Sequence, residues 1–243
     1  MSEICIVNYA EGSWYPRGQA RLYRSLLDVG FPQLGDFHAF NARSLPCRPH
    51  SEVPYGFKVA AFNYAAQHGY RLVLWCDASI WAIRPLDGIF AHIEKTGHVL
   101  FTGGWNCAQW TSDACLQQMG VTRDESEKMP QYSACVMGLD LSQSRSAEFL
   151  QRLNAYAWCQ PSCFLGDWRN DHQQVSRDPR CLGHRHDQSV GSIIACQLGM
   201  EHVIAQDTFF QYYNNAARVP YRYGEANDMS SVPENVLLLN QGM

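Results

Sequence analysis

The sequence contains no long hydrophobic run, no excess of basic residues, and no charged start followed by an apolar block. Its 243 residues include 19 Lys and Arg against 23 Asp and Glu, for a formal net charge of −4. No apolar stretch approaches the roughly 20 residues that a membrane-spanning helix needs. We therefore expect a cytoplasmic protein with no transmembrane segment and no nucleic-acid partner.

Several motifs that identify common α/β proteins are also missing. No G-x-G-x-x-G follows the first apolar run, and no G-x-x-x-x-G-K-[ST] occurs anywhere in the chain. These absences argue against a dinucleotide-binding fold and against a P-loop. There is no internal repeat and no low-complexity tract, so the length favours one domain over residues 1–243.

Tight C-x2-C pairs are absent although the chain has ten cysteines. Without an export signal, we expect these cysteines to be reduced thiols. One cluster of possible zinc ligands occurs within a short span, and its closest pair has C-x3-C spacing, which meets the zinc spacing rule only in part. The cluster contains Cys159, Cys163, His172, Cys181, His184 and His186.

Short apolar runs alternate with helical patterns along the chain. Residues 4–7 and 72–76 are continuous apolar runs, which is typical of strands buried on both faces. Further strands are expected at 98–101, 132–139, 202–205 and 236–239, and helices at 19–29, 55–68, 89–95, 146–158 and 190–198. Residues 102–106 are expected to form a flexible loop. The pattern predicts an α/β fold.

Polar residues follow the two apolar runs at the points where these runs end. Asp77 follows the run at 72–76, and Asn8 and Tyr9 follow the run at 4–7. In open α/β sheets, ligands bind outside the carboxyl ends of the strands, so these positions are candidates for binding. The alternative is that Asp77, Asn8 and Tyr9 are ordinary turn residues.

Two helix starts also carry candidate residues. Lys58 lies in the first turn of the helix expected at 55–68, where a phosphate would be stabilised, although most lysines are simply solvated. Asp187 precedes the helix expected at 190–198 and is well placed as an N-cap. Capping alone does not explain why His, Arg, Asp and Gln are so dense in residues 184–189.

Two of these segments resemble nucleotide-sugar-dependent glycosyltransferases of the GT-A fold. VLWCDASIWAIRPL resembles their D-x-D segment, and HRHDQSVGSIIA resembles the later segment of the retaining family-eight and blood-group-type transferases. The unit VPYGFKVAAFNYAAQHGYRLVLWCDASIW is typical of small bacterial and viral members. The resemblance implies a single GT-A-like domain with a mostly parallel central sheet and helices on both faces.

The resemblance also implies a role for each matching residue. Asp77 takes the place of the first acid of the D-x-D, near the ribose and diphosphate, and Ser79 takes the place of the second. Asp187 and Gln188 are expected at the reaction centre as the catalytic residues. The remaining residues expected to bind substrate are Asn8, Tyr9, Lys58 and His186.

Metal dependence is left open by two departures from the family pattern. In metal-using members the second acid binds Mn²⁺ or Mg²⁺, often together with a His near the C-terminus. Here Ser79 replaces the acid, and the last strand ends at Asn240. Asp77 is then the one carboxylate expected at a metal, and divalent ions of this kind prefer several oxygen ligands.

The predicted function is transfer of a hexose from a nucleotide diphosphate sugar to the hydroxyl of a glycan or another acceptor, with retention of configuration. Two alternatives stay open at this point. One is a non-catalytic nucleotide-sugar or carbohydrate binder that kept the fold and lost the metal site. The other is a zinc hydrolase that uses Cys181, His184 and His186.

Overall fold

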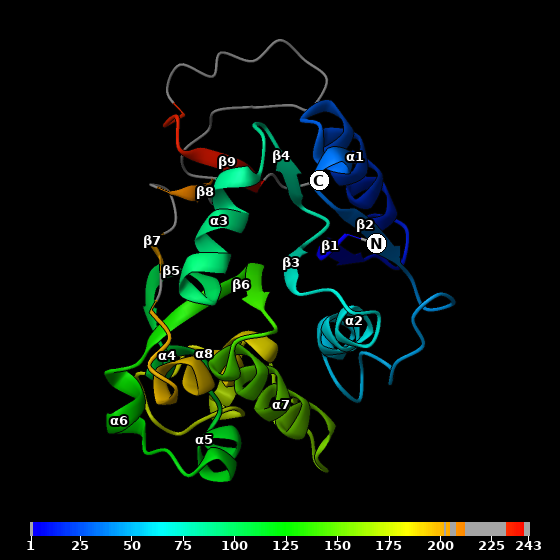
Figure 1. Ribbon diagram of the computed structural model, residues 1–243. Helices are drawn as coiled ribbons and strands as arrows, with labels where there is room; N and C mark the ends of the chain where they lie inside the picture. Colours follow the sequence, from blue (N-terminus) through cyan, green and yellow to red (C-terminus); the bar gives the residue numbers. More distant parts are fainter. Residues whose placement is uncertain (1, 202, 205–207, 212–231, 241–243) are drawn as a thin grey trace.

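The computed structural model describes residues 2–201, 203–204, 208–211 and 232–240 (Figure 1). The strands are β1 (Ile4–Tyr9), β2 (Asp36–Phe40), β3 (Leu72–Cys76), β4 (Ile80–Ala82), β5 (His98–Asn106), β6 (Pro130–Asp140), β7 (Val203–Ile204), β8 (Phe209–Gln211) and β9 (Val236–Asn240). The α-helices are α1 (Tyr15–Asp28), α2 (Gly56–Gln67), α3 (Asp87–Thr96), α4 (Cys107–Trp110), α5 (Asp113–Met119), α6 (Arg123–Glu127), α7 (Ser144–Trp158) and α8 (Asp187–Gln197). Two 3₁₀ turns are η1 (Phe31–Gln33) and η2 (Asp171–Gln173).

A six-stranded sheet in the order β2-β1-β3-β6-β5-β7 forms the centre of the molecule. The β1–β2, β1–β3 and β5–β7 pairs are parallel, whereas β6 runs antiparallel to both of its neighbours. The carboxyl ends of β1 and β3 therefore lie side by side, which brings the residues that follow them to the same edge.

Helices cover both faces of this sheet, because its central strands are apolar on both sides. In β3, Val73 and Trp75 pack with α2, α7 and α8, while Leu72, Leu74 and Cys76 pack with α1 and α3. In Figure 1, α2, α7 and α8 lie on the lower side of the sheet, and α1 and α3 on the upper side. The predicted α/β fold with a mostly parallel sheet and helices on both faces is confirmed.

A second, three-stranded sheet lies beside α1 and α3 in the order β4-β9-β8. The chain leaves the central sheet at Asp77 and enters β4 at Ile80, which pairs with Asn240 at the end of β9. The short link between β3 and β4 therefore lies where both sheets end.

The structure corrects the expected course of several segments. Residues 102–106 are part of β5 and not a loop, because Thr102 and Asn106 pair with β6 across a shift in register. The sequence patterns did not predict β2, β4 or β8, and α1 begins at Tyr15, before residue 19. Of the strand expected at 202–205, residues 202 and 205 lie outside the described residues. Within the described ranges, no helix is both long enough and apolar enough to cross a lipid bilayer.

Helix α8 lies very close to β6, and a glycine permits this approach. A Cβ atom at Gly191 would lie 2.0 Å from the phenolic oxygen of Tyr132, whose side chain is buried. The backbone N–H of Tyr132 donates to the Ser192 hydroxyl at 3.0 Å, so helix and strand are also joined by a hydrogen bond. A larger residue at position 191 must displace one of them.

We expect Gly191→Ala to lower the free energy of unfolding by about 1–3 kcal/mol, the usual cost of overpacking a core. Urea denaturation monitored by circular dichroism measures this change. Gly88→Ala in α3 is the matched control, because a Cβ there meets Phe209 at an ordinary 3.6 Å. We expect the control to stay within about 0.5 kcal/mol of the wild type. Equal effects of the two substitutions would contradict this account.

Candidate functional site

Lys58 connects the two acids that sequence analysis singled out. Its ammonium nitrogen lies 3.3 Å from Asp77 Oδ1 and 3.1 Å from Asp187 Oδ2, and it donates to the Ala134 carbonyl oxygen at 2.8 Å. The Lys58 and Asp187 side chains are only 4% and 6% exposed, whereas that of Asp77 is 28% exposed. An ammonium group has three donors, and three oxygen atoms surround it here. The alternative that Lys58 is simply solvated is therefore wrong.

A bulge in β6 supplies the backbone groups of this site. The pairing of β5 with β6 passes from Leu100–Met137 to Phe101–Ser133, so residues 134–136 have no partner in β5. A bulge of this kind bends the strand and leaves backbone groups unpaired. The Ala134 carbonyl then accepts from Lys58, and the Ala134 N–H donates to Gln188 Oε1 at 3.2 Å. Gln188 thus uses its oxygen internally, which leaves its two amide N–H donors.

The Asp77 carboxylate directly follows β3 and is fixed by a residue of that strand. Trp75 is two residues earlier, so its side chain lies on the same side of the strand. The Trp75 indole N–H donates to Asp77 Oδ1 at 2.7 Å, and the Asp77 backbone N–H donates to the Cys135 carbonyl at 2.8 Å. Trp75 is a site residue that sequence analysis missed, although the spacing of two provided a signal.

The charges of the site influence one another strongly. Burial has the largest effect on the pKa of Lys58 and lowers it, but Asp187 and Asp77 together raise it above its ordinary value. Burial raises the pKa of Asp187 to about 6, with Lys58 opposing this shift and Asp77 adding to it. When all three groups are ionised, two carboxylates face one ammonium group, so the cluster has a net charge of −1.

Two helices begin at this cluster, and each is preceded by a residue with a positive φ. Tyr55 precedes α2 with a φ of 59°, and His186 precedes α8 with a φ of 54°. Their rings lie 5.4 Å apart, and the Tyr55 ring lies 5.2 Å from the Lys58 nitrogen. A positive φ at such residues costs about 1–3 kcal/mol and is concentrated at functional sites.

His186, and not Asp187, is the N-cap of α8, which corrects the capping interpretation of Asp187. Asp187 is the first residue of the helix, and its side chain pairs with Lys58. His186 Nδ1 lies 2.8 Å from the Phe164 carbonyl, so Nδ1 carries the proton and Nε2 is an acceptor. Nε2 is buried and has no hydrogen-bond partner in the described part of the chain. Burial lowers the pKa of His186 to about 4, so the ring is neutral at pH 7.

Asn8 and Tyr9 lie at the end of β1, but their polar atoms serve internal contacts. The buried Asn8 amide donates to the Cys76 carbonyl at 2.7 Å, and its oxygen accepts from Gln19 at 2.8 Å. The Tyr9 ring stacks on Phe57 at 4.5 Å. Asn8 therefore joins β1 to the end of β3. That these residues border a nucleotide stays a prediction.

Ser79 and Asn240, which stand where the family pattern has metal ligands, are hydrogen-bonded to each other. Asn240 Nδ2 donates to Ser79 Oγ at 2.9 Å, and neither residue carries a charge. The Asp77 Oδ1 atom already accepts a hydrogen bond from Trp75 and pairs with Lys58. Mn²⁺ and Mg²⁺ favour several oxygen ligands with carboxylates foremost. Asp77, Ser79 and Asn240 therefore do not fit a resident divalent ion.

Two residues of the cysteine and histidine cluster, His184 and Cys181, make internal hydrogen bonds. The His184 ring accepts from the Ser112 N–H at 3.2 Å and donates to the Cys163 carbonyl at 3.0 Å, so both ring nitrogens are occupied. Cys181 donates to the Thr111 carbonyl at 3.5 Å. No group of three or more His, Cys, Asp or Glu in the described ranges is arranged to hold a metal. This geometry argues against the zinc hydrolase.

Comparison with known proteins identifies the fold. No family model matches the sequence, and no curated protein matches it. The structure of mouse xyloside xylosyltransferase 1 aligns with a TM-score of 0.54 at 10% identity, over 99% of this chain and 97% of that chain. A glycosyltransferase involved in glycosylation of the major capsid of PBCV-1 aligns with a TM-score of 0.52 at 11% identity, over 98% and 92% of the two chains.

A third similar structure is that of the WbbM bifunctional glycosyltransferase. It aligns with a TM-score of 0.55 at 9% identity, over all of this chain but only 46% of that chain. At these identities the similarity establishes the fold and leaves the activity to be argued from the site. The predicted GT-A fold is confirmed.

We expect the double variant Ser79→Asp, Asn240→His to bind Mn²⁺ at least tenfold more tightly than the wild type, because it adds one carboxylate and one imidazole beside Asp77. Isothermal titration calorimetry with MnCl₂ measures the affinity without any reaction. The control is Ser79→Ala, Asn240→Ala, which removes the hydrogen bond and adds no ligand. Mn²⁺ affinity in the wild type equal to that of the Asp/His variant would show that the native residues already suit the ion.

Proposed function

We propose that this protein is a glycosyltransferase that moves a hexose from a nucleotide diphosphate sugar to a hydroxyl group of a glycan or another acceptor. The observation that carries the proposal is the pairing of Asp77 and Asp187 through Lys58. These acids come from the two segments that resemble the family, and the fold holds them around one buried ammonium group. That arrangement suits a polar ligand with several hydroxyl groups.

In this proposal, Asp187 binds the donor sugar, and Lys58 holds the Asp187 carboxylate in place. An ionised carboxylate accepts hydrogen bonds, so Asp187 complements the hydroxyl groups of the sugar. With its pKa raised to about 6, Asp187 is mostly ionised at pH 7. Its negative charge then also stabilises the positive charge that develops on the sugar ring in the transition state.

The chemical step exchanges one bond at the anomeric carbon for another. The bond from that carbon to the diphosphate oxygen breaks, and the acceptor oxygen forms the new bond. The leaving diphosphate takes the proton of the acceptor hydroxyl on the same face, which retains the configuration. Gln188 suits this route better than a covalent intermediate. An amide is a poor nucleophile, and the Gln188 side-chain oxygen already accepts a hydrogen bond from the Ala134 N–H.

The charge that grows on the leaving diphosphate needs donors or cations close to it. The first turns of α2 and α8 both begin at the site, and helix N-termini favour anions. The Arg21 guanidinium donates to the Ser79 carbonyl oxygen at 2.8 Å, so it places a fixed positive charge beside the link that follows Asp77. We assign Arg21 to the diphosphate in this scheme.

The second candidate function is a non-catalytic binder of nucleotide sugars or carbohydrates. The hydrogen bond between Asn240 and Ser79 favours it, because these neutral residues stand where the family pattern has metal ligands. The buried and paired Asp187 favours the enzyme, because a binding protein has little need for a costly buried carboxylate. Release of the nucleotide separates the two functions.

We expect Asp187→Asn to lower the rate of nucleoside diphosphate release at least a hundredfold and to change the affinity for the donor by less than threefold. The substitution keeps the shape of the side chain and removes the charge that the transition state requires. The assay incubates the protein with UDP-glucose, UDP-galactose, UDP-xylose and GDP-mannose, in which water takes the place of the acceptor hydroxyl and receives the sugar, and measures the nucleotide released. Thermal shift with the same compounds identifies the donor that binds.

Glu148→Gln is the matched control, since it removes an exposed carboxylate on α7 that only faces Arg152 at 3.9 Å. We expect wild-type rates for this variant. Binding of a donor without any release by the wild type would support the non-catalytic binder. Unchanged release by Asp187→Asn would remove Asp187 from the mechanism.

A further inference from the structure

Three cysteine thiols meet between α5 and the segment that follows α7. The Cys163 thiol is hydrogen-bonded to the thiols of Cys115 and Cys159. Cys115 lies on α5, and Cys159 directly follows the last residue of α7. All ten cysteines of the chain are free, so each of the three carries a thiol. We call these three residues the thiol trio.

Cys163 is the cysteine of this chain whose thiolate forms most readily. The hydrogen bond with Cys115 has the largest effect on the pKa of Cys163 and lowers it, burial opposes this shift, and the hydrogen bond with Cys159 adds to it. The pKa of every other cysteine in the chain is raised. The thiolate is the nucleophilic form of cysteine. Cys163 is therefore the cysteine best suited to attack an oxidant.

Cys159 is the outer member of the trio. Cys115 and Cys163 are each 2% exposed, whereas Cys159 is half-buried. The Cys159 sulfur accepts from the amide of the exposed Gln118 at 3.2 Å and lies 3.0 Å from the Tyr156 carbonyl oxygen. The same carbonyl accepts from the Cys163 N–H at 3.1 Å. The trio thus adjoins the surface at Cys159, and an oxidant that reaches Cys163 must be small.

The backbone at Cys163 holds the two histidines that precede Asp187. The Cys163 carbonyl accepts from the His184 ring at 3.0 Å, and the Phe164 carbonyl accepts from the His186 ring at 2.8 Å. Both histidines are buried, and His186 directly precedes Asp187 at the start of α8. A displacement of Cys163 therefore reaches the candidate site through two short hydrogen bonds.

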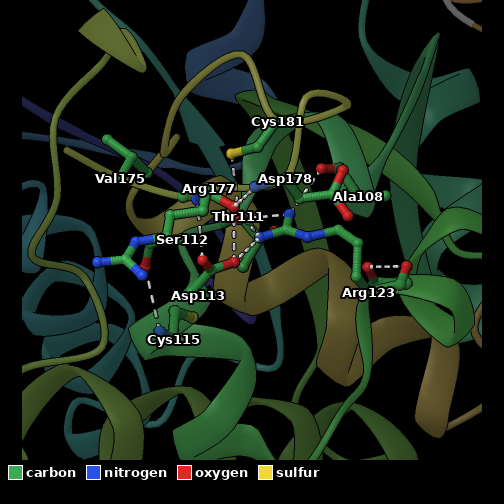
Figure 2. A network of polar contacts seen from close by, with 12 residues as sticks. Ala108, Thr111, Ser112, Asp113, Cys115, Arg123, Val175, Arg177, Asp178 and Cys181 are labelled. Carbon is green, nitrogen blue, oxygen red and sulfur yellow. Dashed lines mark hydrogen bonds and ion pairs between the residues drawn. The ribbon is translucent and has the colours of Figure 1, made fainter. Parts of the chain in front are cut away.

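The other side of the trio is connected to the same histidine. The Ser112 hydroxyl accepts from the Cys115 N–H at 3.1 Å, and the Ser112 N–H donates to His184 Nδ1 at 3.2 Å. Figure 2 shows Ser112 and Cys115 at the start of α5, beside the ion pair of Asp113 and Arg123. The start of α5 is anchored by these contacts, so movement within the trio falls on the segment after α7.

We propose that the thiol trio is a peroxide-sensitive modification site, in which hydrogen peroxide oxidises Cys163 and Cys159 to a disulfide. The Cys163 thiolate attacks one peroxide oxygen and the O–O bond breaks, which gives a sulfenic acid on Cys163 and hydroxide. The Cys159 sulfur then attacks the Cys163 sulfur, the S–O bond breaks, and the oxygen leaves as water. Overall, two thiols and one hydrogen peroxide become one disulfide and two water molecules.

Cys159 is the expected partner of Cys163, because it is the more accessible neighbour and closing the short loop between them costs little entropy. Cys115 acts as the hydrogen-bond donor to the thiolate. The disulfide draws the two sulfurs from hydrogen-bonding contact into a covalent bond, so we expect the Cys163 backbone to move and to weaken the hydrogen bonds to His184 and His186. The inference goes beyond the proposed function, since the oxidation needs no sugar.

Oxidation suits the trio better than metal binding does. Three thiolates are a possible ligand set for zinc. Within the ranges that the structure describes, however, no group of three or more His, Cys, Asp or Glu is arranged to hold a metal.

Mass spectrometry tests the site after the folded protein has been exposed to hydrogen peroxide. The remaining thiols are blocked with N-ethylmaleimide in urea before digestion with trypsin. Cys159 and Cys163 share the tryptic peptide 153–169, whereas Cys115 lies in the peptide 96–123. We expect the peptide 153–169 to lose two hydrogen atoms and to escape the blocking reagent. Cys115→Ala should slow this oxidation at least threefold, because it removes the donor that favours the thiolate.

Hydrogen exchange measures the consequence for the candidate site. We expect the backbone of residues 184–190 to exchange at least threefold faster in the oxidised wild type than in the reduced one, and to recover after treatment with dithiothreitol. Exchange in α3 should stay the same. In Cys163→Ser, peroxide should leave the exchange of residues 184–190 unchanged. Cys159→Ser, at the half-buried position, serves the same purpose should Cys163→Ser fail to fold, which thermal unfolding reveals.

Cys196→Ser is the matched control, because Cys196 is also half-buried but burial raises its pKa to about 11. We expect it to form the disulfide at the wild-type rate. The proposal is wrong if the wild type forms no disulfide, or if peptide 153–169 becomes linked to peptide 96–123 instead. Unchanged exchange of residues 184–190 after complete oxidation would disprove the connection to the site. None of these outcomes bears on the proposed transferase, which nucleotide release tests separately.

Discussion

The buried ammonium group of Lys58 is the interaction on which the site depends. Removing a lysine from water costs several kcal/mol, and the cost is recovered only when the charge is paired and all its protons are bonded. Asp77 and Asp187 pair with the charge and the Ala134 carbonyl accepts a hydrogen bond from it, and each of the three comes from a different part of the sequence. The same contact therefore joins helix α2, the end of β3, the bulge of β6 and the start of α8.

The site combines this fixed centre with local backbone strain and missing metal ligands. Tyr55 and His186 have a positive φ directly before the helices that carry Lys58 and Asp187. Beside them, Ser79 and Asn240 satisfy each other by a hydrogen bond. In the proposed function, this site offers a carboxylate and two helix N-termini to an anionic sugar donor, and among the described residues Asp77 is the one carboxylate next to Ser79 and Asn240 in the family pattern.

Much of the fold could be predicted from the sequence, because buried strands and helices leave periodic patterns. The apolar run of β3 and the acid that follows it were visible, as was the second acid before α8. The pairing of Lys58 with these two acids could not be predicted, since the pattern around Lys58 also suits a solvated lysine. The bulge at Ala134 has no side-chain signature, because it arises from how β5 and β6 pair. For the same reason residues 102–106 were expected to be a loop.

The most direct test of the central claim is a double-mutant cycle between Lys58 and Asp187, measured as free energy of unfolding in urea. Lys58→Met alone leaves a buried carboxylate without its partner, so we expect a loss of about 3–5 kcal/mol. Adding Asp187→Asn removes that charge, and the double variant should be more stable than Lys58→Met alone by at least about 1 kcal/mol. Strictly additive losses, or no loss in Lys58→Met, would contradict the account.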